Sequence, residues 1–184
     1  YNTKFSKVYK ELEKRNLLPF KSSNESIAKI TRIVGHLFGD GGIYEDKAEN
    51  SLKYKIVFTG KKEDLEEIRN DIKYLGFNIS STIESFSKSY VQSNKGIGVI
   101  EGRSYQFRIT NKSLALLLIV LGVPVGDKPL LDYMVPKWLN KVPKWLKKEF
   151  LRAYFGSEMR KPSIRKSRNH TTPIRPDFGI HKLK

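Results

Sequence analysis

Hydrophobic residues recur at helical spacing over two stretches of the chain, and each stretch ends at an acidic residue. In residues 24–40, isoleucine, valine, leucine and phenylalanine return every three or four positions, and the stretch ends at Asp40. In residues 144–158, tryptophan, leucine, phenylalanine and tyrosine do the same, and the stretch ends at Glu158. Both patterns predict amphipathic helices, and the two glycines after Asp40 provide a stop for the first.

The two predicted helices match position by position at a constant offset. Residues 33–41 read IVGHLFGDG, residues 151–159 read LRAYFGSEM, and every aligned position is separated by 118 residues. Small residues match small ones and an acid matches an acid, in the pairs Gly35 with Ala153, Gly39 with Ser157, and Asp40 with Glu158. A repeat at a fixed offset predicts a pseudo-twofold body in which the two helices are equivalent.

Small residues four positions apart on both predicted helices indicate a close contact between them. A glycine inside a helix costs about 1 kcal/mol relative to alanine, so Gly35 and Gly39 need a compensating contact. We expect the face that they clear to pack against the face of Ala153 and Ser157, with the helices lying side by side.

Such a contact would bring Asp40 and Glu158 together at the two helix ends. Two carboxylates repel at close range unless a cation lies between them, and oxygen ligands of this kind suit Mg²⁺. We therefore expect both acids to be metal ligands and catalytic residues. The alternative is a pair of ordinary core helices whose terminal acids face solvent; the matched register of the two copies favours the functional pair.

Alternation of apolar and polar residues between the two helices predicts antiparallel strands. Residues 51–59 and 103–110 alternate cleanly, so one face of each strand is apolar and the other is polar and basic. Residues 77–90 are predicted as a long polar strand, and residues 91–102, which contain three glycines, as a flexible hairpin tip. Residues 61–75 predict a surface helix with one apolar stripe.

The chain divides into three predicted parts. A basic leader occupies residues 1–23, a first repeat with its connecting segment residues 24–142, and a second motif helix with the start of a second repeat residues 143–184. In the last part, residues 162–164 and 178–182 stand where the first repeat opens its two strands. The second unit is therefore expected to be incomplete.

The charge of the chain points to a polyanionic partner. Lysine and arginine number 35 against 19 aspartate and glutamate, which gives a formal net charge of +16. No apolar run approaches the roughly 18 residues of a membrane span, so nucleic acid is a better partner than a membrane. The absence of cysteine excludes disulfides, thiolate metal sites and cysteine nucleophiles. No signal peptide is recognisable, so a cytoplasmic location is expected.

Outward polar side chains on the predicted strands are the candidates for DNA contacts. Serine, threonine, glutamine and arginine can read base edges in the major groove, and lysines near strand ends suit phosphates. The candidates are Lys53, Lys55, Thr59, Ser80, Thr82, Lys88, Arg103, Ser104, Gln106 and Arg108, with Arg165, Arg168 and Arg175 in the basic tail. For the lysines the alternative is solubility alone, and for the tail a disordered basic segment.

Residues 33–41 resemble the LAGLIDADG motif, and residues 151–159 resemble a degenerate copy of it. The chain between them, with TGKK after a predicted strand and LGVPVGDK and VPKWL before the second motif, is similar to the connecting segments of archaeal and intein-associated members. The resemblance covers approximately residues 25–184.

The resemblance implies a homing endonuclease with an α+β fold. Its αββαββα unit would set an antiparallel, saddle-shaped sheet on double-stranded DNA, with helices on the other face and Mg²⁺-dependent cleavage. Backbone carbonyls near Gly39 and Ser157 would complete the metal shell of the two acids. Lys128 lies where the family often places a basic residue close to the scissile phosphate, so the resemblance makes it a third catalytic candidate that could stabilise charge or position water; the alternative is a solvated loop lysine. A complete chain would be a monomer with two pseudo-repeats, and a truncated one could form a dimer.

Two departures from the family pattern bear on catalysis. Met159 stands where glycine is usual, and Gly156 replaces a common acidic or polar position. Because the second unit is also expected to be incomplete, we expect the chain alone to cleave poorly or not at all. Two other classes of function stay open. One is a non-catalytic nucleic-acid binder on the same fold, either an intron RNA maturase or a DNA-binding regulator; the other is a protein–protein module whose charge is incidental.

Overall fold

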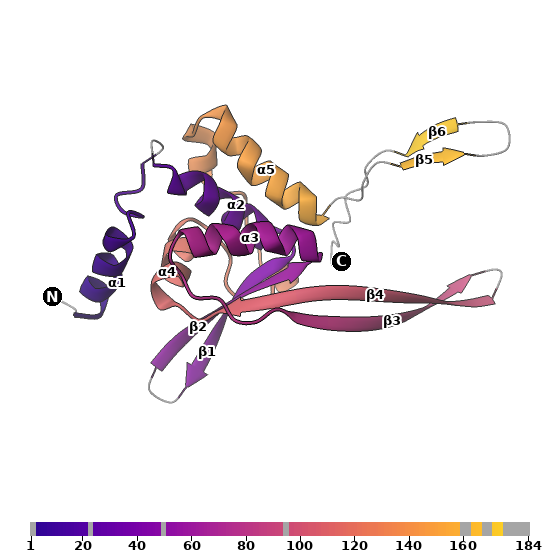
Figure 1. The fold of residues 1–184 in the computed structure, drawn as a ribbon, viewed down its shortest axis with the longest axis horizontal. Helices are drawn as coiled ribbons and strands as arrows, with labels where there is room; N and C mark the ends of the chain where they lie inside the picture. Colours follow the sequence, from indigo (N-terminus) through magenta and orange to yellow (C-terminus); the bar gives the residue numbers. More distant parts are fainter. Residues whose placement is uncertain are drawn as a thin grey trace.

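The structure, a computed structural model, describes residues 3–21, 24–48, 51–93, 96–158, 163–166 and 171–174. Within these residues the fold is α+β, as the sequence predicts. Four antiparallel strands form an open sheet in the order β1-β2-β4-β3, and helices cover one of its faces (Figure 1). The elements are α1 (Thr3–Lys14), α2 (Ser26–Phe38), β1 (Gly41–Ala48), β2 (Ser51–Gly60), α3 (Lys62–Tyr74), β3 (Ile83–Ser93), β4 (Gly96–Ile109), α4 (Lys112–Val120), the 3-10 helices η1 (Lys128–Leu130) and η2 (Lys137–Lys141), α5 (Lys144–Glu158), β5 (Ser163–Lys166) and β6 (Thr171–Ile174).

The motif helices α2 and α5 lie against each other, as the matched small residues predict (Figure 1). Gly35 of α2 faces the backbone of α5 closely: a Cβ on Gly35 would stand 2.4 Å from the Phe150 carbonyl oxygen and 3.2 Å from the Ala153 Cβ. Gly35 and Ala153 are equivalent positions of the two copies. Because equivalent residues meet at the axis of a twofold contact, this contact marks the pseudo-twofold axis.

Alternate residues of the sheet point toward the helices. The buried face of β2 and β4 carries Ile56, Phe58, Phe107 and Ile109. The register places Phe58 opposite Phe107, and their rings stack with centroids 4.8 Å apart. A shift of one residue would turn every one of these side chains to the other face. The alternation in the sequence therefore determines which face of the sheet stays exposed.

The strand predicted at residues 77–90 begins only at Ile83. Gly76 follows α3 with a positive φ of +78° and redirects the chain. Ser80 then lies beside the end of β4, where its amide donates to the Arg108 carbonyl at 3.1 Å and its hydroxyl accepts from the Arg108 amide at 2.9 Å. The polar residues before Ile83 therefore reflect hydrogen bonds to the distant residue Arg108 and not a strand of their own.

The flexible tip predicted at residues 91–102 is instead part of a strand pair. β3 and β4 stay paired from Ile83 with Gln106 to Ser93 with Gly96, and they form an arm that projects beyond the helices (Figure 1). All three glycines of this region fall on β4. Each pairs with a residue of β3, so the glycines do not end the strand.

Helix α1, in the predicted leader of residues 1–23, packs on α4. Its Leu12 is buried, with 4% of its surface exposed. Glu11 accepts hydrogen bonds from the Ser113 hydroxyl at 2.5 Å and from the Asn111 side-chain amide at 3.0 Å. Asn111 also caps α4 with its side-chain oxygen. The leader is therefore a packing extension of the first repeat.

Strands β5 and β6 form a two-stranded antiparallel hairpin after α5. β5 agrees with the strand predicted at residues 162–164. The second strand lies at Thr171–Ile174, whereas the predicted residues 178–182 are outside the described residues. At the offset of 118 residues, β5 and β6 fall within β1 and β2. The hairpin thus occupies the place in the chain where a second unit would open.

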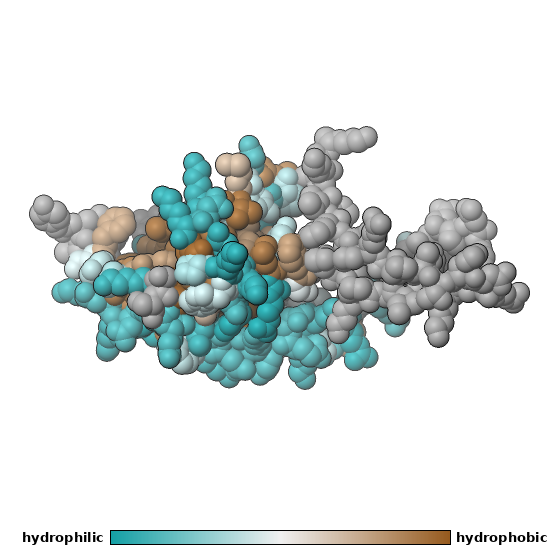
Figure 2. Space-filling model, turned by 90° about the horizontal axis from the view of Figure 1, so that it is seen from above, coloured by the Kyte–Doolittle hydropathy of each residue, from teal (hydrophilic) through white to brown (hydrophobic). Residues whose placement is uncertain are grey.

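Apolar side chains are exposed on α5. Trp145 and Leu151 are 48% and 41% exposed, whereas Ile33, the counterpart of Leu151 in α2, is fully buried. Figure 2 looks down on the helical side of the molecule and shows apolar residues between hydrophilic ones. Within the described ranges, α5 therefore lacks the cover that the sheet gives to α2. None of the described helices is long and apolar enough to cross a membrane.

Replacement of Gly35 by alanine tests the contact between α2 and α5. The added methyl group would meet the Phe150 carbonyl oxygen at 2.4 Å, so one helix must shift. We expect Gly35→Ala to lower the free energy of unfolding by roughly 1–3 kcal/mol, despite the higher helix propensity of alanine. Urea unfolding measures this change.

Gly156→Ala in α5 is the matched control for that substitution. Nothing lies within 4 Å of a Cβ built on Gly156. The same chemical change should therefore be neutral, or stabilising by up to about 1 kcal/mol through helix propensity. Equal losses of stability in the two variants would contradict the close helix packing.

Candidate metal site and nucleic-acid interface

Asp40 lies where the first motif helix meets the sheet. α2 ends at Phe38, Gly39 is buried, and Asp40 is exposed in the turn that leads into β1. β1 begins at Gly41, which pairs with Phe58 near the end of β2. The Asp40 carboxylate is therefore carried by a rigid helix end next to the sheet.

His36 fastens this end of α2 to the sheet. The residue is 3% exposed, and its Nε2 donates a hydrogen bond to the Thr59 carbonyl oxygen at 3.1 Å. Burial lowers the pKa of His36 to about 4, and the Lys128 charge acts in the same direction, against the Thr59 hydrogen bond and Asp64. The imidazole is therefore neutral at pH 7 and serves as a structural hydrogen-bond donor.

Lys128 caps the same helix end from the connecting segment. Its ammonium donates to three successive carbonyls at the end of α2, those of Leu37 at 3.3 Å, Phe38 at 3.2 Å and Gly39. A cation is favourable here because the last carbonyls of a helix lack intrahelical partners and carry the negative end of the helix dipole. The resemblance places Lys128 near a scissile phosphate; the structure places it against the carbonyl that precedes Asp40.

The groups at this helix end suit a hard cation. Asp40 offers a carboxylate and Gly39 a backbone carbonyl, which are the oxygen ligands that Mg²⁺ prefers. The Lys128 ammonium already contacts that carbonyl, so positive charge is stabilised there. No three His, Asp or Glu side chains of the described residues gather closely enough to hold an ion. The side chains of Ser157 and Glu158 lie outside the described ones, so the pairing of the two acids stays a prediction.

Polar and basic side chains line the outer face of the sheet, opposite the helices. The register places Arg108 opposite Val57 and Gln106 opposite Thr59, so the outward positions of β2 and β4 form one surface. Six of the predicted DNA contacts belong to it: Lys53, Lys55, Thr59, Ser104, Gln106 and Arg108. This surface is named here the outer face. Its residue Thr59 follows Phe58, the partner of Gly41, so the outer face extends to the end of β2 that lies next to the turn of Asp40.

Lys88 and Arg103 stand on the other side of the β3–β4 arm. They alternate along their strands with the positions that continue the outer face, such as Ser104. Lys88 forms an exposed ion pair with Glu101 at 2.7 Å, and the Arg103 guanidinium lies over the ring of Phe86. The structure therefore does not bring these two predicted DNA contacts together with the other six.

Ser80 and Thr82 take part in hydrogen bonds within the protein. The Thr82 hydroxyl accepts from Arg69 of α3 at 2.9 Å, and Arg69 also donates to the Ser80 carbonyl at 3.1 Å. Both residues precede β3 and therefore lie outside the strand ladder that carries the outer face. Of the predicted contacts in the tail, Arg165 lies in β5 with its side chain undescribed, and Arg168 and Arg175 lie outside the described residues.

Arg32 is a central residue that sequence reasoning missed. Its guanidinium makes two hydrogen bonds to Asp71 of α3, at 2.7 and 2.8 Å, and a third to Glu149 of α5 at 2.7 Å. The side chain of Arg32 is 15% exposed and that of Asp71 6%. Arg32 stands one turn before Gly35, on the small-residue face of the predicted helix, and an arginine on a face expected to meet another helix was the available signal, because a buried charge requires partners.

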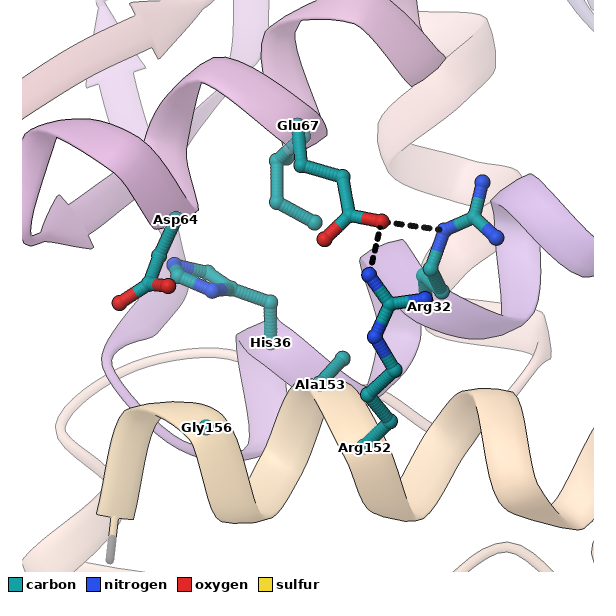
Figure 3. Close-up of a pocket in the computed structure, with 8 residues that line it drawn as sticks. Arg32, His36, Asp64, Glu67, Arg152, Ala153 and Gly156 are labelled. Atoms are coloured by element: carbon teal, nitrogen blue, oxygen red, sulfur yellow. Dashed lines mark hydrogen bonds and ion pairs between the residues drawn. The ribbon is translucent and has the colours of Figure 1, made fainter. Parts of the chain in front are cut away.

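A pocket of about 190 Å³ opens between α2, α3 and α5 on the helical side. Figure 3 shows Glu67 of α3 between the guanidinium groups of Arg32 and Arg152, at 3.8 and 2.6 Å. The pocket lies where the two sides of the α2–α5 pair, related by the pseudo-twofold axis, differ in their side chains. Phe38 and Phe150 fill one side of the helix pair, with ring centroids 5.6 Å apart. Their counterparts at the 118-residue offset are Gly156 and Arg32, which line the pocket.

Comparisons with known proteins place similar segments within much longer chains. The chain is 36% identical to the DNA-directed RNA polymerase subunit Rpo1N of Methanocaldococcus jannaschii over 181 residues, 97% of this chain and 13% of that protein. It is 33% identical to the tRNA-splicing ligase RtcB of Pyrococcus furiosus over 153 residues, 82% of this chain and 15% of that protein. It is 32% identical to the replication factor C small subunit of Methanocaldococcus jannaschii over 143 residues, 78% of this chain and 7% of that protein.

Among solved structures, the homing endonuclease I-WcaI bound to its DNA recognition sequence is similar with a TM-score of 0.42 and 12% sequence identity. The similarity covers 79% of this chain and 62% of that chain. No family model matches the sequence. The chain spans no more than 15% of the length of the three relatives described above.

His36 should make the stability of the fold dependent on pH. Its folded pKa is about 4 against an ordinary value of 6.5, so the unfolded chain takes up the proton first as the pH falls. The contribution of the neutral, buried His36 to the free energy of unfolding is fully present above pH 6.5 and is lost as the pH falls toward 4. Because one pKa unit corresponds to 1.36 kcal/mol, the loss should reach about 3 kcal/mol.

The His36→Gln variant is the reference for this effect. Glutamine keeps a side-chain donor for the Thr59 carbonyl but does not titrate, so this part of the pH dependence should disappear. Urea unfolding of the two proteins between pH 7 and 4.5 measures the difference. Parallel stability curves would contradict a buried, neutral His36.

Proposed function

We propose that this chain is a DNA-cleaving module of the homing-endonuclease type, carried as an inserted element within longer proteins. The observation that carries the proposal is the position of Asp40. This acid lies in the turn between the closely packed helix α2 and strand β1, and Gly41, the next residue, pairs with Phe58 near the end of β2. A carboxylate suited to Mg²⁺ thus stands next to a basic surface suited to DNA.

The comparisons support the inserted element. A polymerase subunit, an RNA ligase and a replication factor subunit have different tasks by name, and the similar segment makes up at most 15% of each. A sequence that moves between genes is expected to occur within proteins of unrelated function, as the similar segments do here. An intein that carries its own endonuclease is such a sequence, and site-specific DNA cleavage is the activity that would let it spread.

The outer face would supply the DNA contacts. Lys53 and Lys55 can neutralise phosphates, whereas Gln106 and Arg108 can donate to base edges in the major groove. The net charge of +16 adds a long-range attraction to the duplex. In this arrangement the sheet fixes the register on DNA, and the motif helices stand over the phosphodiester bond.

Asp40 would hold the metal, with Glu158 and the backbone carbonyls of Gly39 and Ser157 as the remaining protein ligands. When bound, Mg²⁺ would activate a water molecule and stabilise the leaving oxygen of the phosphodiester. The helix end orients Asp40, and the positive charge of Lys128 would favour the phosphate nearby. A non-catalytic binder on the same fold, such as an intron RNA maturase, is the second candidate, because the outer face alone would serve it.

Removal of charge from the outer face should weaken DNA binding. The triple variant Lys53→Ala, Lys55→Ala and Arg108→Ala removes the two lysines assigned to phosphates and the arginine assigned to base edges. The slope of log affinity against log salt should become shallower by about 0.9 for each phosphate that is no longer neutralised. Fluorescence anisotropy with a labelled duplex at several salt concentrations measures the slope.

A control with the same loss of charge keeps the outer face intact. Lys62 and Lys73 are exposed on α3, and Lys88 is exposed on the far side of the arm. The triple alanine variant of these lysines should bind DNA with a nearly unchanged slope. If affinity and slope fall equally in both triple variants, the outer face is not the DNA surface.

Asp40→Asn should abolish the weak cleavage expected of the chain and preserve DNA binding. The amide keeps the size of the side chain but removes the charge that holds a divalent cation. The substrate is host-gene DNA from which the inserted sequence has been deleted, assayed with and without Mg²⁺. Asp132→Asn, at an exposed acid of the connecting segment, is the control and should cleave like the unchanged chain. Intron splicing that persists in Asp40→Asn, with no cleavage by the unchanged chain, would favour the maturase.

A further inference from the structure

We propose that Lys128 holds the metal position in the metal-free protein and is displaced when a divalent cation binds at Asp40 and Gly39. The inference rests on the metal site of the proposed function. Its observation is the set of three carbonyls, those of Leu37, Phe38 and Gly39, that accept from the Lys128 ammonium. Lys128 is thereby a positioning residue for the helix end and not a metal ligand.

A metal ion and the ammonium cannot share this place. A cation bound to the Gly39 carbonyl and the Asp40 carboxylate would stand at contact distance from an ammonium on the same carbonyl oxygen. Like charges in contact repel even where water screens them in part; here Gly39 is buried and Asp40 is exposed. Metal binding therefore requires the Lys128 side chain to give up at least its hydrogen bond to Gly39.

The backbone of Lys128 cannot move away with its side chain. The segment before it is attached to β1, because the Gly126 amide donates to the Ile43 carbonyl at 2.8 Å and Val125 forms a bridge with Ile43. The Lys128 carbonyl in turn accepts from the Leu131 amide at 3.0 Å. Only the side chain is able to rotate, so the displaced ammonium stays within one side-chain length of the metal.

Two consequences follow for the metal-free and metal-bound protein. Without metal, the ammonium neutralises the helix end and keeps the Gly39 carbonyl oriented, which stabilises the fold. With metal, the same charge becomes available to the phosphate side of the site. The competition lowers the affinity for divalent cations in the absence of DNA, so removal of the ammonium should raise that affinity.

Manganese binding without DNA tests the competition. Mn²⁺ takes the same oxygen ligands as Mg²⁺, and the free ion is measured by electron paramagnetic resonance. We expect Lys128→Met to bind Mn²⁺ about tenfold more tightly than the unchanged chain, the size expected from the loss of one charged hydrogen bond. The metal-free variant should melt at a lower temperature, because the carbonyls of Leu37, Phe38 and Gly39 lose the ammonium that they accept from. Lys128→Arg, which keeps a cation, should bind Mn²⁺ like the unchanged chain.

Two further variants separate this inference from the proposed function. Lys137→Met removes the same charge from an exposed position and should leave Mn²⁺ affinity unchanged. If Asp40→Asn weakens Mn²⁺ binding while Lys128→Met and Lys137→Met bind it equally, the displacement is wrong and the metal site stands. If Asp40→Asn does not weaken binding, the metal site is wrong and the inference falls with it.

Discussion

The close approach of α2 and α5 at Gly35 is the constraint on which the rest of the structure depends. With 2.4 Å between a Cβ on Gly35 and the Phe150 carbonyl oxygen, any side chain would push the helices apart. Arg32, one turn earlier, secures the contact, because its guanidinium bonds Asp71 and Glu149 at 2.7 Å each. The side chains of Arg32 and Asp71 are 15% and 6% exposed, so removal of either partner would leave the other charge poorly solvated and without its partner. The glycine makes the approach feasible, and Arg32 links α2 to both α3 and α5.

The helix contact determines what the end of α2 can do. α5 covers one side of α2. The last turn of α2 is held on its other sides by hydrogen bonds, one from His36 to the sheet and others from Lys128 of the connecting segment. Burial keeps the pKa of His36 near 4, so the imidazole adds no charge beside the ammonium. A single protein cation thus stabilises the carbonyls of this turn within the described residues, and the site attracts positive charge at one well-defined place.

The sequence predicted those features that depend on a period or on the internal repeat. The offset of 118 residues predicted the meeting of Gly35 and Ala153, and strand alternation predicted which residues of β2 and β4 are buried. The patterns in the sequence could not predict contacts between segments that are distant along the chain. Ser80 and Thr82 have strand-like neighbours, yet their hydrogen bonds to Arg108 and Arg69 hold them outside the sheet. The glycines of the β3–β4 arm suggested a flexible tip, but a long partner strand keeps them paired.

The two copies agree where they touch and differ where they do not. At the pseudo-twofold axis a residue of one copy packs on its own counterpart, as Gly35 does on Ala153, so either side restricts the other. Away from the axis each residue fits only its own surroundings, and there Phe38 corresponds to Gly156, which leaves the pocket open. Ile33 is likewise buried under its sheet while Leu151 is 41% exposed. A degenerate second copy can therefore keep the helix contact, and with it the position of Asp40, even though the apolar side chains Trp145 and Leu151 of α5 are exposed.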